Sequence, residues 1–167
     1  MTVTIDGSNL NTIGVINSKT AVATTSGTAI DFTGIPAGVK RITVMLNGVS
    51  TNGVSNFQIQ LGAGSVITSG YVSGWSQASS AGAPVTTGFL INAAVAAAHA
   101  YSGSAVLTLL SGNTWVCSSV ICCVTGAVSG TIQGGAVTLS DTLDRVRITT
   151  VNGTDVFDAG SVNILYE

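Results

Sequence analysis

Few side chains in this sequence could do catalytic chemistry, and they are not grouped for it. His99 is the only histidine, so a catalytic triad with a histidine base would depend on it. Asp141 with Asp144, and Asp155 with Asp158, are two pairs of carboxylates that could bind calcium or cleave a glycosidic bond. Both pairs lie among Ser, Thr and Gly residues, where Asp commonly accepts hydrogen bonds from nearby backbone. We therefore predict turn roles for the four aspartates, and a protein that is not an enzyme and has no catalytic residues.

The three cysteines offer neither a disulfide framework nor a metal site. Cys117, Cys122 and Cys123 are odd in number and crowded together, whereas a framework of disulfides needs an even number of well-spread cysteines. Zinc would need a fourth ligand, and the only histidine is far along the chain. We predict reduced, buried cysteines, no metal site and no cofactor.

Four aromatic residues are the candidates for a binding site. Tyr71, Trp75, Tyr101 and Trp115 lie in surroundings rich in Gly and Ser. Aromatic rings stack on sugars, and Asn, Gln, Ser and Thr supply neutral hydrogen bonds, so a glycan site needs no charge. The alternative is that these rings pack in the core or at an interface.

The composition excludes several classes of protein. Of the 167 residues, 46% are hydrophobic and 7% are charged, whereas ordinary soluble domains carry roughly 25% charged residues. Five Lys and Arg residues are too few to neutralise many phosphates, which argues against nucleic-acid binding. The apolar content argues against disorder. Glu167 is the only Glu, so the usual surface of a helical protein is missing.

The mean hydropathy of +0.56 raises the question of a membrane segment. The longest apolar stretch, residues 89–101, is interrupted by Asn92 and His99 and is too short to span a bilayer. The N-terminus has neither the basic region nor the apolar core of a signal peptide. We predict no membrane insertion, with synthesis and folding in a cytosol.

Strand patterns recur at short intervals from Thr20 onward, as in an all-β sandwich. In residues 39–47, Ile42, Val44 and Leu46 alternate with Arg41, Thr43 and Met45, which predicts one buried and one outward face. Asn-Gly pairs at 47–48, 52–53 and 152–153 predict turns. The other expected strands are residues 57–61, 66–75, 85–92, 105–110, 115–124, 136–139, 145–151 and 161–166.

Strands without a convincing helix predict an all-β fold. We expect an antiparallel two-sheet sandwich, jelly-roll-like, over residues 19–167, preceded by an extended N-terminal arm over residues 1–18. Residues 92–100 could form one or two helical turns, or a strand of small residues.

Several predicted strands are apolar on both faces. Every residue of 120–124 is apolar, and Leu165 points away from the face that its strand neighbours share. A single small sandwich has only one inner face per sheet to bury, so we predict an oligomer interface that includes Val120, Ile121, Val124 and Leu165. The alternative is a central strand covered by loops on both sides.

Two long blocks resemble a known family. Residues 26–53 read SGTAIDFTGIPAGVKRITVMLNGVSTNG, and residues 143–167 read LDRVRITTVNGTDVFDAGSVNILYE. They look like a module of structural proteins from tailed bacteriophages, often described as tail-fibre or virion proteins. Weaker likenesses at residues 70–71 and 107–116 extend the resemblance over residues 20–167.

The resemblance implies a β-rich virion module, usually a homotrimer, with no set of catalytic residues. The expectation is a trimeric fibre or tip protein on the tail or particle surface, made in the cytoplasm of the bacterial host. Residues 1–18 would attach it to other virion proteins, and a bacterial surface glycan is the candidate ligand. The alternative is a capsid decoration, cement or head-fibre protein with no receptor role.

Overall fold

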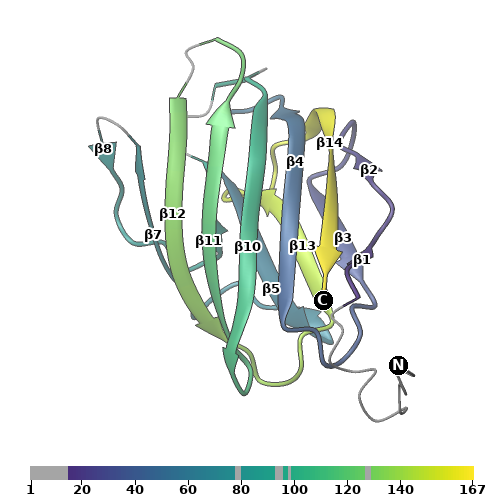
Figure 1. The fold of residues 1–167 in the computed structure, drawn as a ribbon. Coiled ribbons are helices and arrows are strands. Elements are labelled where there is room, and N and C mark those ends of the chain that lie inside the picture. Colours follow the sequence, from purple (N-terminus) through teal and green to yellow (C-terminus); the bar gives the residue numbers. More distant parts are fainter. Residues whose placement is uncertain (1–14, 78–79, 93–95, 98, 127–128) are drawn as a thin grey trace, which may run out of the picture.

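The protein is described by a computed structural model that covers residues 15–77, 80–92, 96–97, 99–126 and 129–167. These residues form two antiparallel sheets and no helix (Figure 1). The larger sheet contains β1 (Asn17–Ser18), β2 (Val22–Ala23), β4 (Arg41–Thr51), β7 (Val72–Gln77), β8 (Ser80–Ala81), β10 (Tyr101–Ser111), β11 (Thr114–Cys123), β12 (Ser129–Thr138) and β14 (Phe157–Tyr166). The smaller sheet contains β3 (Ala29–Thr33), β5 (Phe57–Ala63), β6 (Ser65–Val66), β9 (Phe89–Leu90) and β13 (Arg145–Thr150).

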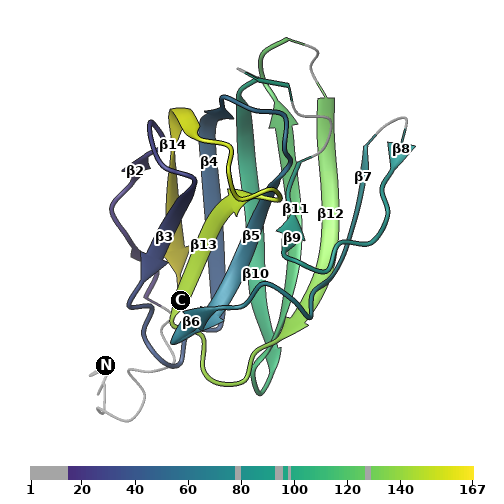
Figure 2. The same cartoon turned by 180° about the vertical axis from the view of Figure 1, so that it is seen from behind.

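The two sheets pack face to face, which confirms the predicted all-β sandwich. Figure 2 shows the smaller sheet lying across the inner side of the larger one. The core lies between them because side chains alternate across each strand. In β4 the predicted inner residues Ile42, Val44 and Leu46 are buried, whereas Arg41 is exposed.

The order in which the strands pair shows that the chain passes repeatedly from one sheet to the other. The larger sheet runs β1-β14-β4-β10-β11-β12-β7-β8, with β2 also beside β14. The smaller sheet runs β3-β13-β5-β6, with β9 also beside β5. From β2 to β5 the chain changes sheet at each step, and it does so again from β6 to β7, on both sides of β9 and on both sides of β13. Strands that are distant in sequence are therefore neighbours in space.

Both sides of the sandwich are crossed by the chain. On one side, the segment between β2 and β3 leaves the edge of β14 and reaches the edge of β13. On the other side, Val85 pairs with Ser73 of β7, and β9 pairs with β5 a few residues later. These crossings shield sheet edges that would otherwise offer unpaired backbone groups.

The turn predicted at Asn47–Gly48 is wrong, because both residues lie inside β4. The register of β4 shifts against both of its neighbours in this region, which marks an irregularity of the bulge type. Gly48 and Gly160 have φ values of +63° and +93°, a conformation that glycine adopts without steric cost. The strand bends there and continues. The other two Asn-Gly pairs do lie between strands, as predicted.

Two expected strands are broken where the chain crosses between the sheets. The expected strand 66–75 consists of the short β6 and the start of β7, with a loop between them. The expected strand 85–92 contains only the Val85 bridge and β9. Of the segment 92–100, residues 93–95 and 98 lie outside the described residues.

The predicted arm falls mainly on residues 1–14, which lie outside the described residues. Its last two residues, Asn17 and Ser18, form β1 and pair with Tyr166 and Leu165 of β14. The end of the predicted arm is therefore an edge of the larger sheet.

Candidate interaction surface

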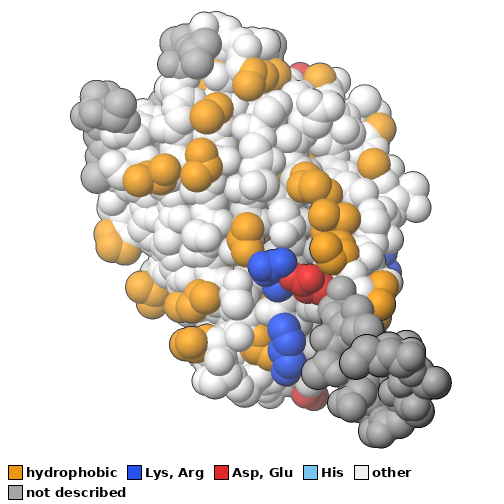
Figure 3. All heavy atoms as spheres, in the orientation of Figure 1, with side chains coloured by type: hydrophobic (Ala, Val, Ile, Leu, Met, Phe, Trp, Pro, Cys, Tyr) orange, Lys and Arg blue, Asp and Glu red, His pale blue; other side chains and the backbone are white. Residues whose placement is uncertain are grey.

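The outward face of the larger sheet carries almost no charge. In the nine strands that the structure describes for this sheet, only Arg41 and Asp158 are charged. Arg41 forms an ion pair with Glu167, and the Asp158 carboxylate accepts a hydrogen bond from the Ser50 hydroxyl. Figure 3 shows hydrophobic side chains spread over this face with few charged groups among them.

Aliphatic side chains stand out from this face on three neighbouring strands. Val120 of β11 and Ile132 of β12 are direct cross-strand partners, and each is 59% exposed. Val72 of β7 is 71% exposed. Exposed aliphatic residues are ordinary when scattered, but on neighbouring strands of an uncharged face they indicate an interaction site.

Of the four predicted interface residues, three are accessible. Val120 and Val124 are exposed, and Leu165 is half-buried on the same outward face. Ile121 is fully buried, because odd-numbered residues of β11 point into the core. Its assignment to an interface is wrong, because the residues of the apolar run 120–124 point alternately into the core and out of the larger sheet.

Three of the four candidate glycan-binding aromatics are part of the core. Tyr71, Tyr101 and Trp115 are buried. The ring of Tyr71 meets that of Phe89 edge to face at 5.0 Å, and its hydroxyl accepts a hydrogen bond from the Leu61 N–H at 2.6 Å. Their rings lack the open face that stacking on a sugar requires, so the predicted four-residue glycan site is wrong.

Trp75 is the exception among the four, and it is half-buried. It lies opposite Gln133 on the inward side of β7, near the edge of the larger sheet. Gly82 packs so closely on the indole that a β-carbon there would lie 2.0 Å from a ring atom. The indole ring is thus held against the backbone at Gly82.

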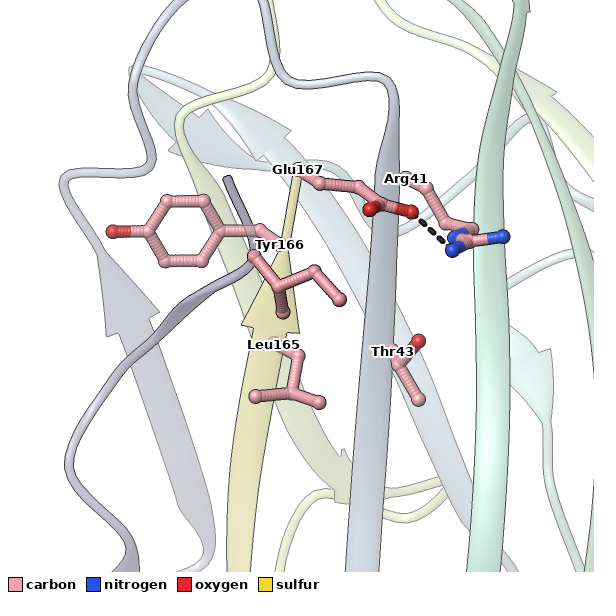
Figure 4. A pocket seen from close by; sticks show the side chains of 6 residues that line it. Arg41, Thr43, Leu165, Tyr166 and Glu167 are labelled. Atoms are coloured by element: carbon pink, nitrogen blue, oxygen red, sulfur yellow. Dashed lines mark ion pairs between the residues drawn. The ribbon is translucent and has the colours of Figure 1, made fainter. Parts of the chain in front are cut away.

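A small hollow lies at one end of the outward face (Figure 4). Its walls are the Arg41–Glu167 ion pair with Thr43 and Leu165, and Ile16 also lines it. Its volume of about 80 Å³ leaves room for a few water molecules. The hollow is too small to hold an oligosaccharide.

The smaller sheet has a polar outward face. Arg147 binds Asp31 of β3 with two hydrogen bonds of 2.7 Å. Arg145 binds Asp144 in the same two-pronged way, and this hydrogen bonding lowers the pKa of Asp144. The two faces of the sandwich therefore differ sharply: charge and hydrogen bonding lie on the smaller sheet, and aliphatic surface lies on the larger one.

Asp141 and Asp155 accept hydrogen bonds within their own turns, as predicted, whereas Asp158 lies in β14 and Asp144 binds the distant Gly64 N–H and the Arg145 side chain. Asp155 accepts hydrogen bonds from the Ser55 N–H at 2.8 Å and from the Asn152 amide at 2.6 Å. Asp141 accepts one from the Thr142 N–H at 2.6 Å. Within the described residues, no cluster of three or more His, Cys, Asp or Glu side chains could hold a metal ion.

The cysteines are free, and Cys117 and Cys123 are buried as predicted, whereas Cys122 is half-buried. The imidazole of His99 packs against Gly126, where a β-carbon would lie 2.6 Å from Nε2. The structure brings no nucleophile to this histidine among the contacts that it describes, and a packing role accounts for its position.

Burial of acidic protons predicts that the fold weakens in alkali. Burial raises the pKa of Tyr71 and of Cys117 to about 12, from ordinary values of 10.0 and 9.0. The folded state holds these protons more tightly than the unfolded chain, so their contribution is complete below about pH 9 and is lost as the pH rises to about 12. Tyr71 alone should contribute on the order of 2 kcal/mol to this loss.

Urea unfolding at a series of pH values between about 8 and 12 measures this effect. Tyr71→Phe and Cys117→Ala should each reduce the alkaline slope of the free energy of unfolding. A free energy that stays flat up to pH 11 would contradict the prediction.

The sequence interpretation missed Val72 and Ile132, which complete the aliphatic surface with Val120. The sequence does contain a sign of them, because Val72 and Ile132 each alternate with polar or small residues in their own strands. Cross-strand register decides which alternating residues meet, and register depends on pairing rather than on one strand's pattern.

Comparisons of the chain with protein-family models, with curated proteins and with solved structures give no match. Among the described residues, no helix is both long and apolar enough to cross a bilayer.

Proposed function

We propose that the chain is a structural component of a bacteriophage virion, a β-sandwich module that assembles as a homotrimer on the tail or particle surface. The observation that carries the proposal is the uncharged outward face of the larger sheet, with Val72, Val120 and Ile132 exposed on it. A protein that remained alone would leave this surface in water, whereas assembly removes it from water.

The connectivity supports the same proposal. If β1, β6, β7, β8, β11 and β12 are set aside, β2-β14-β4-β10 faces β3-β13-β5-β9. We infer from this order a jelly roll. Its sequence has an insertion, β11 and β12, between β10 and β13. Viral capsid proteins and lectins use jelly rolls, and the resemblance of residues 26–53 and 143–167 to phage structural proteins agrees with it.

A decoration, cement or head-fibre protein without a receptor role is the second candidate. The burial of Tyr71, Tyr101 and Trp115 favours it, because the aromatic set that suggested a host glycan as ligand is used for packing. Both candidates are non-enzymatic, and both place the protein in the virion with copies of itself and other virion proteins as its partners.

Particle composition tests the proposal. In purified particles of a phage that encodes the chain, mass spectrometry should detect it. Hundreds of copies on the head would favour decoration, and a few copies per tail would favour a fibre or tip. Absence from the particle would refute the proposal.

The attachment role of the N-terminal residues has its own test. Deleting residues 1–14 should leave a folded trimer that is not incorporated into particles. This deletion retains β1, so a folding defect from the loss of its pairing with β14 is avoided. Normal incorporation of the shortened chain would contradict the role.

A further inference from the structure

We propose that the outward face of the larger sheet, at β7, β11 and β12, packs head to tail against the same face of two neighbouring copies of this chain around a three-fold axis. This inference rests on the self-association in the proposed function and assigns the surface that performs it. The contact is a ridge of aliphatic side chains on one copy that enters a row of hollows on the other. Val120 and Ile132 form the ridge, since they are cross-strand partners and both are exposed.

Beside the ridge, two residues further along each strand, lies a row of small residues that leaves the surface hollow. Ser118 of β11 lies opposite Gly134 of β12, which lies opposite Gly74 of β7. A hollow of about 390 Å³ lies over the two glycines, and another of about 160 Å³ lies beside Ser118. The rows of ridge and hollow are two residues apart along each strand, or about 7 Å.

The fold of the single chain does not account for the two glycines. A β-carbon at Gly74 or at Gly134 would meet nothing within 4 Å, and neither residue has a positive φ. Glycine weakens the interior of a strand, and it often marks a place where another backbone or a ligand comes close. An approaching surface explains why side chains are missing there.

Area and charge favour a second copy as that surface. The three strands span about 14 Å by about 33 Å, or about 480 Å², and the neighbouring uncharged β10 brings the face to about 600 Å², one partner's share of a small specific interface. The ridge and the hollows lie on one face, so each copy offers both complementary parts. The face is uncharged at these strands, so identical copies do not repel each other.

The test is the mass of the chain and of two variants at micromolar concentration, by sedimentation or mass photometry. The unaltered chain should show about three times its mass of 16.6 kDa. Ile132→Lys places a charge on the ridge and should weaken association by at least about 30-fold. Gly134→Val fills the hollow and should weaken association at least tenfold without lowering the melting temperature, since Val suits a strand.

The matched control is Thr33→Lys, which adds the same charge at an exposed position on the smaller sheet. It should leave the mass unchanged. If Ile132→Lys and Gly134→Val both remain oligomers like the unaltered chain, the assigned face is wrong while self-association stands. If the unaltered chain is a monomer, self-association itself fails. A monomer whose variants lose incorporation into particles would mean that the face binds another virion protein, which also overturns the second copy.

Discussion

Replacing Phe57 by alanine should lower the free energy of unfolding by about 3–5 kcal/mol. Phe57 begins β5 and is fully buried. Its ring packs against those of Tyr101 at 5.4 Å and Phe157 at 5.8 Å, so it joins β5 of the smaller sheet to β10 and β14 of the larger one. Truncation removes apolar burial from both sheets and leaves a cavity that a close-packed core fills only in part.

This loss is a large share of the stability of an ordinary domain, which is about 5–15 kcal/mol. Urea unfolding followed by fluorescence measures the loss. Val54→Ala is the matched control, because Val54 lies three residues away and is 71% exposed, so its loss should stay within about 0.5 kcal/mol. A loss below about 1 kcal/mol for Phe57→Ala would mean that the three rings do not hold the sheets together.

Gly160→Ala should be nearly as damaging, for a reason of backbone geometry. Gly160 has a φ of +93°, and a β-carbon there would lie 2.4 Å from the carbonyl carbon and oxygen of Gly48. The strain of the left-handed conformation costs about 1–3 kcal/mol, and overpacking against the backbone adds about 1–3 kcal/mol. The central pairing of β14 with β4 must open to admit the methyl group.

Two other glycines separate these costs. Gly48 has a φ of +63° with open space around its would-be β-carbon, so Gly48→Ala should show the strain alone, about 1–3 kcal/mol. Gly134→Ala has neither strain nor contact and should be neutral or stabilising by about 0.5–1 kcal/mol. Thermal unfolding of the three variants measures the order of their stability losses. Equal losses for Gly160→Ala and Gly48→Ala would contradict the predicted clash.

The sequence predicts the positions of strands and turns best where the residue pattern of a single strand is sufficient to fix them. The alternation of Ile42, Val44 and Leu46 with polar or exposed neighbours places β4 correctly, and the Asn-Gly pairs at 52–53 and 152–153 mark true turns. The Asn47–Gly48 pair is locally indistinguishable from these. It lies inside a strand because β10 and β14 flank it on both sides, and that pairing is a long-range effect.

The candidate site was harder to predict than the fold. Gly and Ser beside Tyr71 and Trp115 in the sequence suggest a surface, but burial is decided by the opposite sheet. Gln58 of β5 shows the reverse case: a polar residue that points outward is buried, because its amide bonds to the Thr150 carbonyl and the Thr87 hydroxyl. Local polarity therefore does not reveal which side chains lie in water.

Residues 26–53 and residues 143–167, the two blocks on which the expected family assignment depends, are partners in the fold. Residues 26–53 contain β3 and β4, and residues 143–167 contain β13 and β14. β4 pairs with β14, and β3 pairs with β13. The two blocks thus form a connected part of both sheets.

The position of β14 has a consequence for how the protein is made. This strand is made after every other strand that the structure describes, yet it lies between β2 and β4 in the larger sheet. A growing chain that has released β2, β4 and β10 still has a gap where β14 belongs, and it exposes the unpaired edge of β4 during elongation. Folding therefore has to await completion of translation up to residues 157–166, and the nascent chain is most prone to aggregate just before that point.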